Sequence, residues 1–220
     1  MSRFDLVLFD CDGVLVDSEG LSARSTAGVL QDLGLDIDAP TVLRRFMGKS
    51  DRSMCEALAA ETGLVFPPDM QARLDTAALE LSERELEAMP GIVDLLRQLR
   101  LPRCVASSST PERIRRSPAL TGLLDLLEPH IFSATMVERG KPAPDLFLHA
   151  ARAMGAEPEA CVVIEDSTAG VTAGKAAGMT VIGFVGGSHV DPATHGARLR
   201  ELGADAVVDE MAAVAARLAG

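Results

Sequence analysis

Short apolar runs separated by helix-length segments are the feature that most limits how this 220-residue chain can fold. The runs lie at residues 6–9, 104–106, 161–164, 181–185 and 206–208. Continuous apolar runs of this length are typical of strands buried on both faces, as in a parallel sheet. Of the segments between the later runs, 144–154 carries apolar residues at helical spacing and 168–177 is rich in alanine. This alternation predicts an α/β fold with a largely parallel sheet.

The stretch from residue 16 to residue 90 interrupts the alternation, because it contains helical patterns and no strand-like run. Apolar residues recur there at helical spacing over 54–59 and 70–81. Pro90 and Gly91 form a pair that stops a helix and permits a turn. We therefore expect two domains: a core of residues 1–15 and 91–220, and a small all-helical domain of residues 16–90 inserted after the first strand.

Composition and charge exclude several classes of partner. The formal net charge is -11 and the pI is about 4.8, and the chain has no basic stripe that could hold a nucleic acid or an anionic membrane. The sequence shows neither a secretory signal nor an apolar segment of the ~20 residues that a membrane span needs. We therefore expect a cytoplasmic monomer that binds neither nucleic acid nor membrane. The four cysteines stand singly, which predicts buried free thiols.

Acidic, hydroxyl and lysine side chains follow the predicted strands or lie between them. Ligands of open α/β sheets bind beyond the carboxyl ends of the strands, so these positions are candidates for a site. The set consists of Asp10, Asp12, Ser107 to Thr110, Lys141, Glu165 and Asp166.

The chemistry of this set indicates a phosphate site. Converging acids would raise one another's pKa by mutual repulsion, so a bound divalent metal explains them most simply. The candidate ligands are all oxygens, which favours Mg²⁺ over Zn²⁺. The hydroxyl-rich turn 107–110 opens a helix, where N–H groups favour an oxyanion. A carboxylate that attacks a phosphate ester needs a metal and a lysine to offset the repulsion, and a second acid can protonate the leaving oxygen.

Four ordered motifs carry a resemblance to a known family. They are "DCDGVLVDSE", "VASSS", "GKPAPDLF" and "VVIEDSTAGVTAGKAAGM". The set resembles the haloacid dehalogenase superfamily, and more narrowly the subgroup that includes β-phosphoglucomutase-like enzymes and sugar-phosphate phosphatases. The resemblance implies a Rossmann-like core with a helical cap domain inserted after the first strand. It also implies Mg²⁺ as cofactor and a small phosphate ester as substrate.

The resemblance assigns the chemical step to two acids. Asp10 would be the nucleophile that forms an aspartyl-phosphate and would also bind the metal. Asp12 would be the general acid and base, and its backbone carbonyl would bind Mg²⁺.

The remaining roles concern binding. By the same resemblance, Ser107 and the amide of Ser108 would bind the transferring phosphoryl group. Lys141 would pair with the phosphate and with the nucleophile. Asp166 would complete the metal site, with Glu165 as a direct or water-mediated ligand, although Glu165 could instead cap the helix that begins near residue 168.

Two reactions compete within the subgroup, hydrolysis and transfer between two hydroxyls of one sugar phosphate. The mutases of the subgroup carry threonine, histidine and arginine at the places of Ser18, Ser22 and Asp51. These departures favour hydrolysis, with a β-phosphoglucomutase-like mutase as the alternative. The opening "MSRFDLVLFDCDGVLVDSE" resembles the subgroup's phosphatases that act on small phosphorylated sugars or sugar acids. The dehalogenases of the superfamily need no Mg²⁺ and would not require an acid at Asp12, so the acids favour phosphate chemistry. An inactive binding module would be expected to have lost Asp10, Asp12, Lys141 or Asp166, and all four are present.

Three features allow more than one interpretation. Lys49 and Arg52 lie near the Gly48 loop with two further arginines and could bind the anionic substrate, or could belong to a solvated helix face. The four histidines show no ligand spacing, and we expect structural or solvent-facing roles for them. The loop 186–196 follows a strand, and a role on the substrate side is open.

Overall fold

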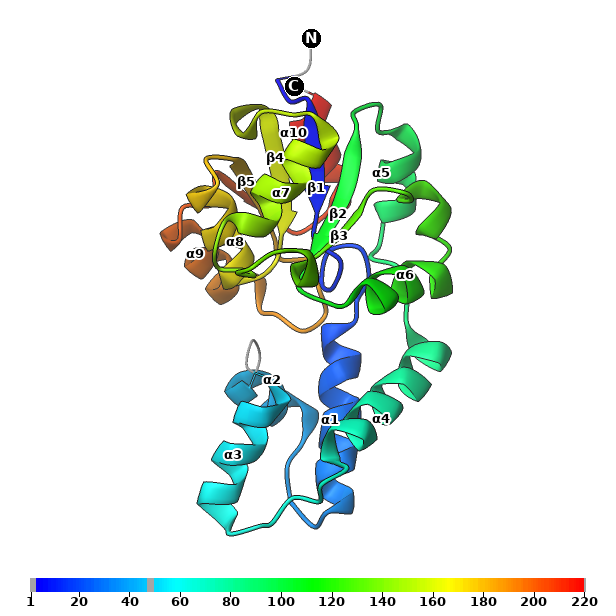
Figure 1. Cartoon of the computed structure of the whole chain (residues 1–220), viewed down its shortest axis with the longest axis vertical. Helices are drawn as coiled ribbons and strands as arrows, with labels where there is room; N and C mark the ends of the chain where they lie inside the picture. Colours follow the sequence, from blue (N-terminus) through cyan, green and yellow to red (C-terminus); the bar gives the residue numbers. More distant parts are fainter. Residues whose placement is uncertain (1–2, 47–49, 220) are drawn as a thin grey trace. The chain divides into compact units, whose positions relative to one another are not determined.

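The computed structural model describes residues 3–46 and 50–219. Within them the chain forms a six-stranded, all-parallel sheet with strand order β3-β2-β1-β4-β5-β6 (Figure 1). The strands are β1 (Leu6–Phe9), β2 (Arg103–Ser107), β3 (Ile131–Ser133), β4 (Cys161–Glu165), β5 (Thr180–Phe184) and β6 (Ala206–Val208). The predicted α/β class with a parallel sheet is confirmed.

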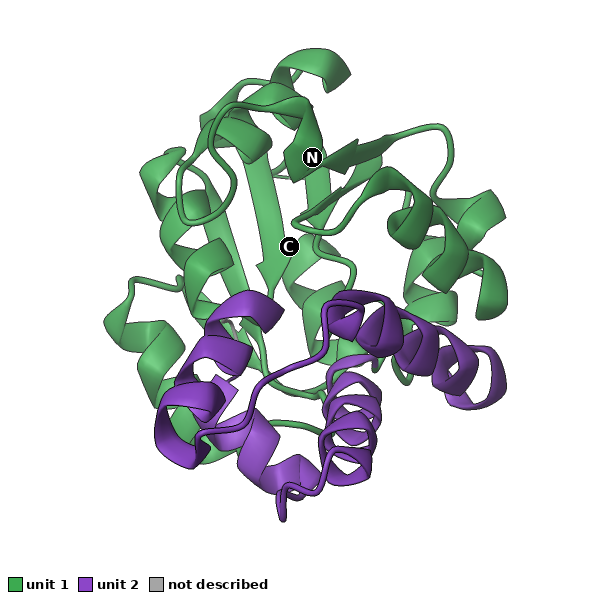
Figure 2. Cartoon of the chain, turned by 60° about the horizontal axis from the view of Figure 1, so that its bottom comes forward, with its two compact units in different colours: residues 1–17, 87–220 green, residues 18–86 purple. Residues whose placement is uncertain are grey.

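The chain divides into two compact units, coloured in Figure 2. Unit 1 consists of residues 1–17 and 87–220, and unit 2 of residues 18–86. Our predicted bounds for the insert, 16–90, lie within four residues of those of unit 2 at each end.

The regular secondary structure of unit 2 is all helical in its described residues. Its helices are α1 (Glu19–Asp32), α2 (Ala39–Phe46), α3 (Asp51–Thr62) and α4 (Met70–Glu85). Leu30, Met54, Leu58 and Leu74 are buried in a core of its own, because apolar residues at helical spacing place one face of each helix inward.

Unit 1 carries helices on both faces of its sheet. They are α5 (Ile92–Gln98), α6 (Pro111–Leu120), α7 (Asp145–Met154), α8 (Thr168–Ala176), α9 (Pro192–Glu201) and α10 (Met211–Ala219), with short 3₁₀ turns at Leu124–Leu126, Ala134–Met136 and Pro158–Ala160. Figure 1 shows α7 and α8 in front of the strands, where α7 packs on β1 to β3 and α8 on β4 and β5. Leu6 and Leu8 belong to the core with Phe147, and Val7 and Phe9, which alternate with them, are equally buried. Burial on both faces explains why the run is continuously apolar.

One strand was missed. β3 has only Ile131 and Phe132 as apolar residues before Ser133, and a run that short is indistinguishable from a loop by periodicity. It forms because Val105 in β2 pairs with Ile131.

The strand order brings the candidate residues to one edge. β1 lies between β2 and β4, with Phe9 opposite both Val105 and Ile164. The residues that close these three parallel strands therefore emerge side by side. No helix of the described part of the chain is long and apolar enough to cross a bilayer.

Candidate active site

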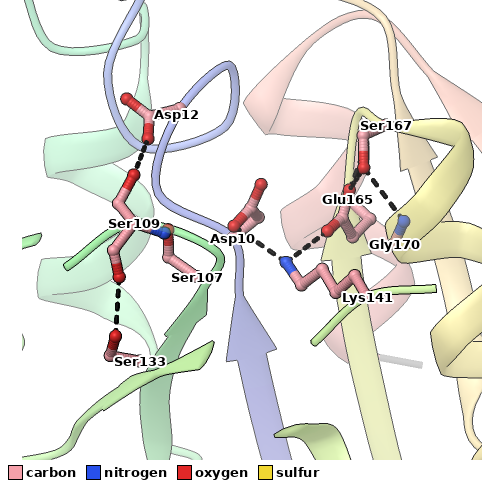
Figure 3. A network of polar contacts seen from close by, with 9 residues as sticks. All are labelled: Asp10, Asp12, Ser107, Ser109, Ser133, Lys141, Glu165, Ser167 and Gly170. Atoms are coloured by element: carbon pink, nitrogen blue, oxygen red, sulfur yellow. Dashed lines mark hydrogen bonds and ion pairs between the residues drawn. The ribbon is translucent and has the colours of Figure 1, made fainter. Parts of the chain in front are cut away.

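A buried lysine bridges two carboxylates at the centre of this edge (Figure 3). Lys141 Nζ lies 2.9 Å from Asp10 Oδ1 and 2.5 Å from Glu165 Oε1. Its side chain is 3% exposed and its ammonium lies 4.9 Å from the centre of the Phe147 ring. Burial alone would lower the pKa of Lys141, but the charges of Asp10 and Glu165 outweigh burial and raise it. The lysine is therefore held as a cation beside Asp10.

Glu165 is fully buried at the end of β4 and accepts hydrogen bonds on both oxygens. Lys141 donates to Oε1, while the backbone N–H and the hydroxyl of Ser167 donate to Oε2 at 2.8 and 2.9 Å. The residue that caps α8 is Ser167, whose Oγ accepts from Gly170 N–H at 2.9 Å. The alternative in which Glu165 itself caps the helix is thus wrong.

Three acids form a compact oxygen cluster. One carboxylate oxygen from each of Asp10, Glu165 and Asp166 lies within 4.8 Å of the others, and all three residues are buried. Burial raises the pKa of Asp10 well above its ordinary value, and the charges of Glu165 and Asp166 raise it further against the opposing effect of Lys141. A divalent cation would offset this repulsion, and an all-oxygen set suits a hard ion. The residues present therefore fit a site for such a cation.

Gly13 permits the close approach of Asp166. Its φ is +76°, and a Cβ placed on it would lie 2.0 Å from Asp166 Oδ2. No side chain larger than hydrogen fits there, which explains the glycine directly after Asp12.

The side chain of Asp12 lies apart from the acid cluster. Its Oδ2 accepts from the Ser109 hydroxyl at 2.9 Å, and Arg113 Nη2 lies 3.3 Å from its Oδ1. This orientation leaves the backbone carbonyl as the group that Asp12 could offer to a metal. The contact with Arg113 was not predicted, because the arginine lies in the first turn of α6 and belongs to none of the motifs.

The turn after β2 is ordered by its own hydroxyls. Ser107 is buried, and its Oγ accepts from Ser109 N–H at 3.1 Å, whereas Ser108 is exposed. Thr110 caps α6, and Ser133 donates to the Ser109 carbonyl at 2.7 Å. Ser133 was missed because its strand was missed.

Two residues of the insert, Lys49 and Arg52, were predicted to bind the substrate. Lys49 lies outside the described residues. Arg52 is exposed on α3 of unit 2, and its part in substrate binding stays a prediction. Among the neighbouring arginines, Arg45 pairs with Glu61 at 2.6 Å within the same unit.

The family model described as haloacid dehalogenase-like hydrolase matches residues 4–178. The chain is 34% identical to 6-phosphogluconate phosphatase of Escherichia coli (strain K12), over 89% of each chain. It is 36% identical to hexitol phosphatase A of the same organism, over 80% of each chain.

Solved structures that resemble this chain carry the same family description. A conserved haloacid dehalogenase-like protein from Agrobacterium tumefaciens str. C58 superposes with a TM-score of 0.88 at 36% identity, covering 99% of this chain and 100% of that one. A family hydrolase from Deinococcus radiodurans R1 with bound phosphate and sodium gives a TM-score of 0.84 at 36% identity over 99% of both chains. The chain belongs to the haloacid dehalogenase-like hydrolase family. Within that family it is a phosphatase.

Proposed function

We propose that this protein hydrolyses a sugar or sugar-acid phosphate, with Mg²⁺ and an aspartyl-phosphate formed on Asp10. The observation that carries the proposal is the Asp10 carboxylate, which lies 2.9 Å from the buried Lys141 ammonium and within the acid cluster. A carboxylate beside a cation and a hard-metal site is equipped to approach a phosphate anion. The names of the relatives support the substrate class.

Mg²⁺ would be held by Asp10, Asp166 and the backbone carbonyl of Asp12. Both oxygens of Glu165 already accept hydrogen bonds, so we assign Glu165 to the metal through water. When bound, Mg²⁺ supplies positive charge to the phosphate oxygens.

The other steps of the reaction are carried out by side chains and a backbone amide of the chain. Asp10 attacks phosphorus, and the bond to the ester oxygen breaks as that oxygen takes a proton from Asp12. Asp12 then removes a proton from water, which cleaves the aspartyl-phosphate and returns Asp10 and inorganic phosphate. Ser107 and the amide of Ser108 bind the phosphoryl oxygens, and Lys141 offsets their charge.

The test is phosphate release from 6-phosphogluconate, hexitol phosphates, fructose 1-phosphate and β-glucose 1-phosphate, with and without Mg²⁺. We expect Mg²⁺-dependent release that Asp10→Asn abolishes without unfolding the protein, because the change is nearly isosteric and removes the nucleophile. Retained release in Asp10→Asn would refute the mechanism. Glucose 6-phosphate appearing from β-glucose 1-phosphate without free phosphate would show a mutase instead.

A further inference from the structure

Two histidines from the segment after β5 contact the same acid. His189 Nε2 lies 3.4 Å from Asp166 Oδ2, and the His189 side chain is 2% exposed. His195, in the first turn of α9, places its Nε2 2.6 Å from the backbone carbonyl oxygen of Asp166. The predicted loop 186–196 is thus a loop only up to Asp191, because α9 begins at Pro192, and this segment contacts the acid cluster at Asp166.

The two contacts fix different parts of Asp166. A carbonyl oxygen only accepts, so His195 Nε2 carries the proton and donates it, which anchors the backbone at the end of β4. A carboxylate likewise only accepts when ionised, so the tautomer that suits His189 has its proton on Nε2, facing Oδ2. One histidine thus holds the main chain and the other faces the side chain.

Glycines allow this approach from the loop side. A Cβ on Gly187 would lie 2.7 Å from two atoms of the His189 ring, and one on Gly186 would lie 2.2 Å from the Asp209 carbonyl oxygen. Ser188 N–H donates to Asp17 Oδ1 at 3.3 Å, which ties the loop to the segment that follows β1. Close packing on this side leaves the Asp166 carboxylate little freedom to turn.

We propose that His189 and His195 are positioning residues that hold Asp166 in the orientation that binds the divalent cation, and that this is the role of the segment 186–196. The inference rests on the proposed function, since it takes Asp166 as a metal ligand. Groups that orient a ligating carboxylate or imidazole from outside typically contribute a factor of about 10–100 in metal affinity.

The variants separate orientation from packing. His189→Leu removes the donor and keeps an apolar filler, whereas His189→Gln keeps an N–H donor of comparable reach. His189→Asn keeps an amide that is too short to reach Asp166. His149→Leu is the matched control, because His149 is half-buried on α7 against the Phe132 ring.

The readout is the Mg²⁺ dissociation constant of the substrate-free protein, measured by calorimetry beside the melting temperature. We expect His189→Leu to weaken Mg²⁺ binding about 10–100-fold, His189→Gln to stay near the parent value, and His149→Leu to leave it unchanged. If His189→Leu does not fold, we expect His189→Asn to bind Mg²⁺ clearly more weakly than His189→Gln.

Parent-like Mg²⁺ affinity in His189→Leu, or equal affinity in the asparagine and glutamine variants, would overturn the inference and leave a packing role. These outcomes differ from failure of the proposed function, in which the parent protein itself would bind no Mg²⁺ and release no phosphate.

Discussion

Arg113 Nη2 lies 3.3 Å from Asp12 Oδ1, while the Ser109 hydroxyl donates to the other oxygen of the same carboxylate at 2.9 Å. The arginine side chain is 49% exposed, so the pair contributes only about 0–1 kcal/mol to folding. The main effect of the pair is to orient the Asp12 carboxylate. Two donors on opposite oxygens restrict how the Asp12 carboxylate turns.

Arg113→Gln should therefore impair protonation of the leaving group. We expect kcat/KM for an alkyl phosphate, whose leaving oxygen needs a proton, to fall about tenfold more than for p-nitrophenyl phosphate, whose leaving group needs none. Arg115→Gln is the control, because Arg115 lies on the same helix at similar exposure and pairs with Glu128. An equal loss on both substrates would refute this role.

Gly170→Ala should damage the site from within. A Cβ at this buried position would lie 1.8 Å from Glu165 Oε1, so the carboxylate that holds Lys141 must move. We expect loss of activity and a free energy of unfolding lower by about 1–3 kcal/mol in urea denaturation. Gly28→Ala in α1 meets nothing within 4 Å and should instead stabilise the protein by up to about 1 kcal/mol. A stable, active Gly170→Ala variant would contradict the inference that Glu165 must stay in place to hold Lys141.

The thiols should react unequally. Cys11, Cys104 and Cys161 are buried and free, and Cys55 is half-buried. Burial raises the pKa of Cys161 to about 11 and that of Cys11 well above its ordinary value. Because the thiolate is the reactive form, we expect a thiol reagent at pH 8 to label Cys55 first and the others only on unfolding. Rapid labelling of Cys11 in the native protein would contradict its burial.

Asp205 should make stability depend on pH. Its Oδ2 accepts from Lys175 Nζ at 2.7 Å and from Val181 N–H at 2.8 Å. Burial raises its pKa, but these hydrogen bonds outweigh burial and lower it. The stabilisation is therefore fully present above the unfolded pKa of about 3.9 and is lost as pH falls through the lower folded value.

We expect Asp205→Asn to lower the free energy of unfolding at pH 7 by about 1 kcal/mol, with the difference from the parent shrinking towards pH 3. Urea titrations at several pH values measure both. Asp36→Asn, at an exposed loop position of unit 2, serves as the control. If the difference in free energy of unfolding between the parent and Asp205→Asn grows as the pH falls, the pKa of Asp205 is not lowered in the folded protein and the prediction is wrong.

The sequence predicted where the site residues lie along the backbone, but it did not predict which way their side chains point. Apolar runs that are buried on both faces precede Asp10, Glu165 and Asp166. Because parallel strands end at a common edge of the sheet, the pattern predicts that these three residues converge. The turn of Asp12 towards Arg113 depends on rotamers and on a helix that only the folded chain brings near.

The loop contacts had no periodic signal at all. His189 approaches Asp166 from a segment whose glycines and single proline indicate only a turn. Similarly, β3 exists because β2 offers it a pairing edge, not because Ile131 and Phe132 mark a strand. Tertiary context decides such elements.

The division of unit 1 into residues 1–17 and 87–220 has a consequence for synthesis on the ribosome. The strand β1, which ends directly before Asp10, is made first, yet its partners β2 and β4 are completed only at Ser107 and Glu165. Unit 2 is contiguous and is complete before either partner exists, and domains generally fold as units during synthesis. Until then β1 remains without its partner strands, and its apolar side chains are open to wrong pairing in the nascent chain.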